Sequence, residues 1–129
     1  MIGQTSLPAL QAASMLLQNK TCMIVGAASL RGIGFAAARL FAQHGARVAV
    51  VDIAMDQAAT DQVRSAISQS IGAEPNLIAI RCDIRNAADC DQAVAKTVQA
   101  FGSLDSLVNC AGIVRSQPML SIAEADLAR

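Results

Sequence analysis

Three glycines and one aspartate have types and spacing that could do chemistry. Gly26, Gly32 and Gly34 lead into an expected helix, and Asp52 follows 20 residues after Gly32. Glycines let the backbone approach a phosphate without a Cβ atom in the way, and a helix N-terminus offers unpaired N–H groups and the positive end of its dipole. A carboxylate at the end of the next strand accepts hydrogen bonds from ribose hydroxyls. The spacing therefore predicts a site for the pyrophosphate and ribose of an adenine dinucleotide.

The glycine pattern alone is weak, because small residues also gather at turns for purely steric reasons. Ala37 completes a Gly-x-Gly-x-x-Ala pattern with Gly32 and Gly34, in which the small residue lets helix and strand pack closely. Asp52, at the spacing that such a site requires, favours the dinucleotide interpretation.

Two charged residues bear on which dinucleotide is bound. The Asp52 carboxylate would repel the additional phosphate of NADP, which favours NAD. Arg31 favours the opposite choice, because a guanidinium beside the ribose could hold that phosphate; alternatively, Arg31 is a solvated loop charge. We predict NAD as the cofactor, with NADP as the weaker ligand.

The elements that position these residues alternate between short apolar runs and longer helical segments. This rhythm predicts an α/β fold with a doubly wound parallel sheet. Strands are expected at 22–25, 47–52, 77–82 and 104–109, and helices at 33–44, 55–71 and 87–101, each helix closed by the glycine that follows it. Asn86 is expected to cap the third helix, and Ser121 with Glu124 has capping-box spacing for a fourth.

Length and composition fit one soluble domain. Hydrophobic residues make up 53% of the chain and charged residues 16%, against norms of about 45–50% and about 25%. Ten basic and ten acidic side chains, with 2% aromatic residues, give no reason to expect nucleic acid or a membrane as partner. The four cysteines show no Cys-x-x-Cys spacing, so we interpret them as buried thiols of a cytoplasmic protein, and we expect no metal site.

Residues 1–19 are expected to form a weakly amphipathic extension before the domain at 20–129, without a secretory or transit signal. A second hypothesis takes Met15 as the natural start, because the residues from Met15 lead directly into the first strand.

From about Lys20 to Arg129 the chain resembles the N-terminal half of the short-chain dehydrogenase/reductase family. Four pieces carry the resemblance in order, and together they are specific. They are the loop from Gly26 to Gly34, Asp52 after the second strand, Cys82-Asp83-Ile84 after the third, and Leu107-Val108-Asn109-Cys110-Ala111-Gly112 in and after the fourth.

The resemblance implies a Rossmann-like sheet with strand order 3-2-1-4, truncated after the fourth strand, and hydride transfer between a nicotinamide cofactor and an alcohol or carbonyl. Asp83 and Ile84 would meet the adenine, although Asp83 is alternatively a turn acid that caps its own backbone. Asn109, Ala111 and Gly112 would line the cofactor channel. The residues expected to bind the cofactor are Gly26, Ser29, Arg31, Gly32, Ile33, Gly34, Asp52, Ile53, Asp83, Ile84, Asn109, Ala111 and Gly112.

Two features depart from the family's commonest pattern. Five residues separate Gly26 from Gly32 where three are usual, a spacing similar to that of the branch that includes enoyl reductases, and Val25 replaces the usual threonine. Cys110 stands where the family commonly has a second asparagine, and we interpret it as structural because no base is near it in sequence. The subfamily therefore stays open.

The family's catalytic residues are not found in this chain. Hydride transfer there needs a tyrosine acid/base, a lysine four residues later and a serine, but this chain has no tyrosine, and neither Lys20 nor Lys96 is suitably placed. By resemblance those groups lie beyond Arg129. We therefore predict an N-terminal fragment with no catalytic residue and no activity of its own, in which the fourth strand is an exposed edge of the sheet and nucleotide binding is weak.

A non-catalytic dinucleotide-binding or interaction module is the alternative, and a methyltransferase is disfavoured by residues 109–112. A small-molecule substrate is expected only in a full-length form, and by resemblance the family forms homo-oligomers.

Overall fold

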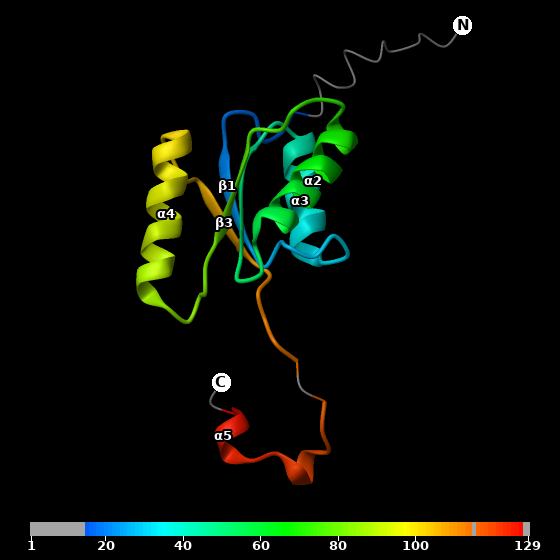
Figure 1. Ribbon diagram of the computed structural model, residues 1–129, viewed down its shortest axis with the longest axis vertical. Coiled ribbons are helices and arrows are strands. Elements are labelled where there is room, and N and C mark those ends of the chain that lie inside the picture. Colours follow the sequence, from blue (N-terminus) through cyan, green and yellow to red (C-terminus); the bar gives the residue numbers. More distant parts are fainter. Residues whose placement is uncertain (1–14, 115, 128–129) are drawn as a thin grey trace, which may run out of the picture.

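Four parallel strands form the centre of the protein. The computed structural model describes residues 15–114 and 116–127, so the prediction for residues 1–14 lies outside the described residues. The strands lie in the order β3-β2-β1-β4, which confirms the predicted 3-2-1-4 arrangement (Figure 1). Their bounds are Thr21–Val25 for β1, Arg47–Asp52 for β2, Leu77–Arg81 for β3 and Ser106–Asn109 for β4.

Helices cover both faces of the sheet. The helices α2 (Ile33–Gln43) and α3 (Gln57–Ile71) lie on one face, and α4 (Ala87–Phe101) lies on the other (Figure 1). Alternate residues of β1 divide between the two cores: Cys22 and Ile24 belong to the core under α2 and α3, and Met23 and Val25 to the core under α4. Burial on both faces explains why the strands are apolar without alternation.

The observed elements differ from the expected ones mainly at their ends. The strand β4 begins at Ser106 rather than at residue 104. Just before it, the Asp105 carboxylate accepts a hydrogen bond from the Thr21 amide at 2.7 Å. Leu17, placed in the expected extension, packs against the core under α2 and α3. Its amide donates to the His44 carbonyl at 2.9 Å, so residues before Lys20 take part in the domain.

The cap of α4 confirms a prediction. The Asn86 side chain accepts hydrogen bonds from the amides of Ala88 and Asp89 at 2.9 and 3.4 Å, and Gly102 ends the helix with φ of 81°. These bonds satisfy two of the N–H groups that a helix start leaves without partners.

Asn86→Ala is therefore expected to lower the free energy of unfolding by about 0.5–2 kcal/mol. Chemical denaturation of the full chain measures the change, with Asn86→Ser as the matched control because serine also caps well. Equal loss in both variants would show that the cap contributes nothing specific.

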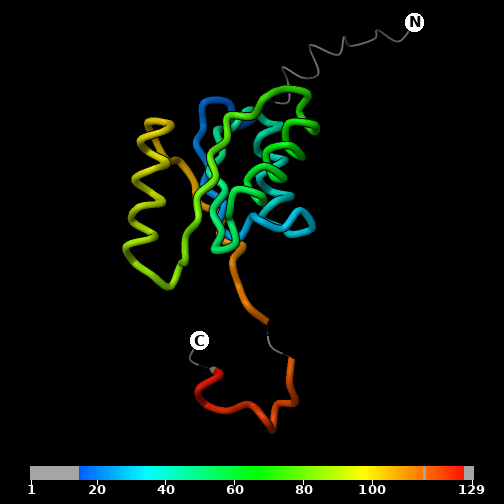
Figure 2. The backbone as a smooth tube through the Cα atoms, viewed as in Figure 1, coloured from blue at the N-terminus to red at the C-terminus, as the bar shows by residue number. Residues whose placement is uncertain are grey.

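The segment after β4 leaves the sheet. It carries a 3-10 turn, η1 (Met119–Ser121), and the short helix α5 (Glu124–Leu127), both apart from the layers of the domain (Figures 1 and 2). The capping-box prediction at Ser121 is wrong: the Ser121 hydroxyl donates to the Pro118 carbonyl at 2.8 Å, and α5 starts at Glu124, which puts Glu124 in the first position of the helix rather than the third. Among the described residues β4 pairs only with β1, so it is the edge strand that the sequence predicted.

Across residues 15–114 and 116–127, no helix has both the length and the apolar character that a membrane crossing requires.

Candidate dinucleotide-binding site

The predicted site residues gather at the carboxyl edge of the sheet. Val25, the last residue of β1, is paired with Val51 on one side and with Asn109 on the other. The loops that follow β1, β2 and β4 therefore start next to one another, at the point where the strand order reverses, which is where open α/β sheets bind ligands.

Gly26 lies in a position that only glycine fits. Its φ is 84°, and a Cβ added to it would lie 2.6 Å from the Ala111 amide nitrogen and 2.7 Å from the Cys110 carbonyl carbon. The Gly26 amide donates to the Val51 carbonyl at 2.7 Å. Gly26 thus allows the start of the loop to lie against the residues that follow β4. Ala111 belongs to the site through this backbone contact.

Gly34 brings α2 onto the same loop. It is buried in the first turn of α2, and a Cβ there would collide with the Gly26 carbonyl oxygen and lie 2.8 Å from its carbon. Gly32 is the N-cap residue of α2, without any side-chain cap. An uncapped helix start in contact with a glycine turn is the arrangement that binds phosphate groups.

Asp52 is fixed by two backbone amides. Its Oδ2 accepts a hydrogen bond from the Ala28 amide at 3.0 Å, and its Oδ1 accepts one from the Ala54 amide at 2.9 Å. The first bond joins the end of β2 to the glycine loop across the sheet edge. A carboxylate has about four acceptor positions, so Asp52 retains capacity for a ligand hydroxyl.

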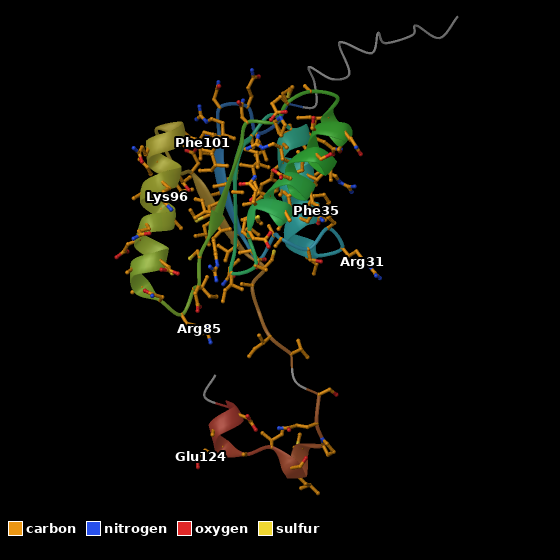
Figure 3. All side chains as sticks on the ribbon, in the orientation of Figure 1. Arg31, Phe35, Arg85, Lys96, Phe101 and Glu124 are labelled. Atoms are coloured by element: carbon orange, nitrogen blue, oxygen red, sulfur yellow. The ribbon has the colours of Figure 1, made fainter. Side chains whose placement is uncertain are left out.

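The remaining loop residues face solvent. Ser29 and Arg31 are exposed, and Arg31 points away from the body of the domain (Figure 3). Ile33 exposes 81% of its surface at the start of α2. The structure therefore brings Gly26, Gly34 and Asp52 together, whereas Ser29 and Arg31 stand at the rim.

Ile53 and Asp83 share a small polar pocket between the ends of β2 and β3. The pocket has a volume of about 300 Å³ and is also lined by Arg81 and Asp89. Sequence reasoning missed these last two. Arg81 ends β3 and donates from Nε to the Ile53 carbonyl at 3.2 Å, and Asp89 accepts from the Asp83 amide at 3.0 Å. Only the strand pairing brings the residues after β2 and β3 together.

Arg85 holds Asp83 in its charged form. The Arg85 side chain donates to both carboxylate oxygens of Asp83, with Nη2 and Oδ2 2.7 Å apart, and the Arg85 amide donates to Oδ1 at 3.0 Å. These bonds lower the pKa of Asp83 from its ordinary 3.8 to about 2. The bond from the Arg85 amide makes Asp83 a turn acid, as the alternative interpretation expected. This role does not exclude a contact between Asp83 and the adenine.

Arg85→Gln is expected to return the pKa of Asp83 toward 3.8, because the guanidinium bonds that favour the carboxylate are lost. A carboxyl group whose pKa is lowered by folding stabilises the fold above its unfolded pKa, so this contribution disappears as the pH falls from 3.8 toward 2. Carbon-detected NMR titration of Asp83 measures the shift, with Arg39→Gln as the control. An unchanged pKa in Arg85→Gln would contradict the assignment.

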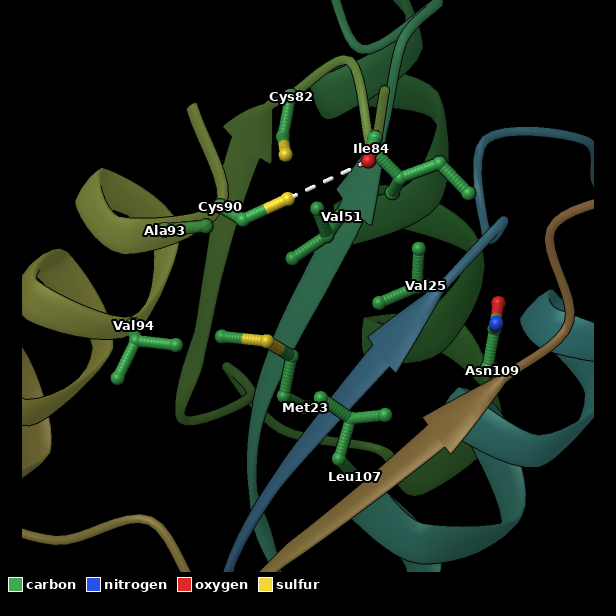
Figure 4. A pocket seen from close by; sticks show the side chains of 10 residues that line it. All are labelled: Met23, Val25, Val51, Cys82, Ile84, Cys90, Ala93, Val94, Leu107 and Asn109. Carbon is green, nitrogen blue, oxygen red and sulfur yellow. Dashed lines mark hydrogen bonds between the residues drawn. The ribbon is translucent and has the colours of Figure 1, made fainter. Parts of the chain in front are cut away.

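Ile84 and Asn109 line a second pocket on the α4 face of the sheet (Figure 4). It also has a volume of about 300 Å³, and its other walls are apolar side chains of β1, β2, β4 and α4 together with two cysteines. The Asn109 side chain accepts from the Ala111 amide at 3.0 Å, which fixes the turn after β4. Gly112 is exposed, and nothing lies within 4 Å of a Cβ added to it, so the structure gives Gly112 no contact in the site.

Comparison with known proteins agrees with this geometry. A family model described as enoyl-(acyl carrier protein) reductase matches residues 26–129. An uncharacterized short-chain type dehydrogenase/reductase, y4mP of Sinorhizobium fredii, is 44% identical over 116 residues, which cover 89% of this chain and 44% of that protein. The chain belongs to the short-chain dehydrogenase/reductase family.

Further members of the short-chain dehydrogenase/reductase family are similar in sequence and structure. Zerumbone synthase of Zingiber zerumbet is 35% identical over 87% of this chain and 39% of its own length. A dehydrogenase/reductase from Sinorhizobium meliloti superposes with a TM-score of 0.75 and 38% identity, over 92% of this chain and 45% of that one. A hydroxysteroid dehydrogenase from Escherichia coli superposes with a TM-score of 0.74 and 32% identity, over 91% of this chain and 46% of that one. The chain thus spans less than half the length of these short-chain dehydrogenases.

Members of the family use nicotinamide cofactors in oxidoreductase reactions. The observed strand order is the Rossmann-like arrangement that the sequence predicted.

Proposed function

We propose that this chain binds the NAD of a short-chain oxidoreductase that transfers hydride between the nicotinamide and an alcohol or carbonyl substrate. The observation that carries the proposal is the uncapped start of α2, held against Gly26 beside the fixed carboxylate of Asp52. Bound NAD supplies the hydride acceptor of such a reaction. The residues of this chain bind and orient it.

The pyrophosphate would lie at the start of α2. No side chain caps this helix, so its first amides and the positive end of its dipole are available to an anion. Gly26 and Gly34 leave no Cβ between the loop and the ligand. Ile33, exposed at the same place, offers an apolar surface to the nucleotide.

The adenosine would extend toward the ends of β2 and β3. Asp52 accepts hydrogen bonds from the ribose hydroxyls, and the polar pocket of Ile53 and Asp83 lies next along the sheet edge. Ile84, 47% exposed, gives the adenine an apolar contact. The nicotinamide end would then point toward Asn109 and Gly112, beyond β4.

The Asp52 carboxylate favours NAD over NADP, because a 2′-phosphate would meet a charge of the same sign. Arg31, the residue that could offset this charge, is exposed and directed away from the domain (Figure 3).

The acid/base chemistry of the reaction requires residues outside this chain. The family's proton donor is a tyrosine, and this chain has none. We therefore expect the 129-residue chain to bind the cofactor without turning over a substrate. A small-molecule substrate and association between subunits would belong to a longer form, in a cytoplasmic setting.

A non-catalytic module that senses NAD is the second candidate. The coding DNA after Arg129 separates the two: an open frame with Tyr-x-x-x-Lys supports the oxidoreductase, and a natural stop supports the module.

Isothermal titration of the full chain with NAD and with NADP tests the cofactor proposal. Heat of binding with NAD, and weaker binding of NADP, is the expected result. Tighter binding of NADP would overturn the NAD assignment.

A further inference from the structure

Two cysteines face one another behind the predicted adenine contacts. Cys82 directly follows β3 and is 3% exposed, whereas Cys90, in the first turn of α4, is partly exposed. Both line the second pocket, and their sulfur atoms point toward each other (Figure 4). The Cys90 thiol donates to the Ile84 carbonyl oxygen at 3.6 Å.

The surroundings keep Cys82 protonated. Burial raises the pKa of its thiol to about 11, and the neighbouring Cys90 thiol and the Asp89 and Asp83 carboxylates act in the same direction. Within the described part of the chain, no cluster of three or more histidine, cysteine or acidic residues could hold a metal. Cys90 is the more exposed of the two thiols, so a small reagent in the pocket meets it first.

We propose that Cys82 and Cys90 form a dithiol that hydrogen peroxide oxidises to a reversible disulfide, and that this disulfide weakens nucleotide binding. The pocket of about 300 Å³ admits an oxidant of that size.

The reaction balances in two steps. The Cys90 sulfur attacks one peroxide oxygen and the O–O bond breaks. Cys90 becomes a sulfenic acid, and the released hydroxide takes the proton of the Cys90 thiol and leaves as water. The Cys82 sulfur then attacks the sulfur of Cys90, the S–O bond breaks, and the released hydroxide takes the proton of the Cys82 thiol to give a second water. Two thiols are oxidised and one peroxide is reduced to two waters.

The disulfide would change the segment 82–90 that carries Asp83 and Ile84. Bond formation draws the Cys90 sulfur away from the Ile84 carbonyl and shifts the first turn of α4, where Asp89 holds the Asp83 amide at 3.0 Å. This part of the inference rests on the proposed function, in which Asp83 and Ile84 contact adenosine. We expect the oxidised chain to bind NAD about fivefold or more weakly than the reduced chain.

Peptide mapping by mass spectrometry after peroxide treatment of the full chain tests the dithiol itself. The expected result is a link between Cys82 and Cys90, reversed by dithiothreitol, with Cys22 and Cys110 still free to be alkylated. Cys22 is the internal control because it is buried in the other core, under α2 and α3. Accumulation of sulfinic acid at Cys90 without a link, or links that join other cysteines, would overturn the proposal.

Two variants keep the test independent of folding defects. Cys90→Ser changes a partly exposed side chain and Cys82→Ala a buried one, and each is expected to abolish the link. Cys110→Ser, the matched control, is expected to retain it. A link between Cys82 and Cys90 that fails to form in Cys110→Ser would contradict the assignment.

Titration with NAD before and after oxidation tests the coupling. A reduced chain that binds NAD and an oxidised chain that binds it equally well would refute the coupling. If oxidation forms the disulfide but the chain binds no NAD even when reduced, the proposed function would be refuted instead. The two failures are therefore distinguishable.

Discussion

Gly34→Ala is expected to cause a large loss of stability and of nucleotide binding. The new Cβ would collide with the Gly26 carbonyl oxygen and lie 3.2 Å from the Ala27 Cα, and all of these obstacles are backbone atoms. Backbone cannot move aside as a flexible side chain can, so the cost of overpacking should reach the upper part of its usual range of about 1–3 kcal/mol. Because α2 and the loop after β1 must separate, the phosphate site is displaced too.

Thermal unfolding followed by circular dichroism measures the first effect. About 3 kcal/mol corresponds to a fall in Tm of roughly 10–20 °C for a domain of this size. Calorimetry with NAD measures the second effect, and we expect the affinity to fall by about tenfold or more, which is roughly 1.4 kcal/mol. For the loss of stability, Gly112→Ala is the matched control, because nothing lies within 4 Å of its added Cβ. Equal loss of stability in both variants would contradict the packing argument.

Asp52→Asn is expected to remove the preference for NAD over NADP. The amide keeps an acceptor for the Ala28 or the Ala54 amide but carries no charge, so the repulsion of a 2′-phosphate disappears. At an effective dielectric constant of about 20, one charge pair at about 4 Å contributes roughly 4 kcal/mol, and solvent screening at this open edge reduces that considerably. We expect the ratio of the two affinities to shift toward NADP by about tenfold.

Glu74→Gln separates a local effect from a change in net charge. Glu74 precedes β3 at the opposite edge of the sheet, where it pairs with Arg64 at 2.8 Å, an exposed ion pair of small energetic value. Both substitutions remove one negative charge. The ratio of NAD to NADP affinities should be unchanged in Glu74→Gln, and an equal shift in both variants would refute a direct role for Asp52.

Sequence patterns were sufficient for the sheet and for the residues at its switch point. Apolar runs locate the strands because strand residues are buried in the cores on both faces of the sheet. Gly26 and Gly34 could be recognised because close backbone contacts at these positions admit only glycine, and Asp52 because the site requires a carboxylate there. Asn86 was predictable as a cap because its role depends only on the next three residues.

Features that depend on contacts between distant segments were not predictable. Arg81 and Asp89 enter the polar pocket only because β2 and β3 are adjacent and α4 returns beside them. The pair of Cys82 and Cys90 joins a strand end to a helix face, and its spacing matches no known motif. The capping prediction at Ser121 was wrong because it used only the spacing from Glu124. In the structure the Ser121 hydroxyl donates to the Pro118 carbonyl within a 3-10 turn.

By our proposal, the loop between β1 and α2 binds an adenine dinucleotide together with Asp52. Two-dimensional amide NMR of the folded chain during titration with NAD tests it most directly. We expect saturable shifts confined to Gly26–Gly34, Asp52–Ile53, Asp83–Ile84 and the turn after Asn109. An absence of shifts, or shifts that cluster at the opposite edge of the sheet around Glu74 and Asp105, would contradict it.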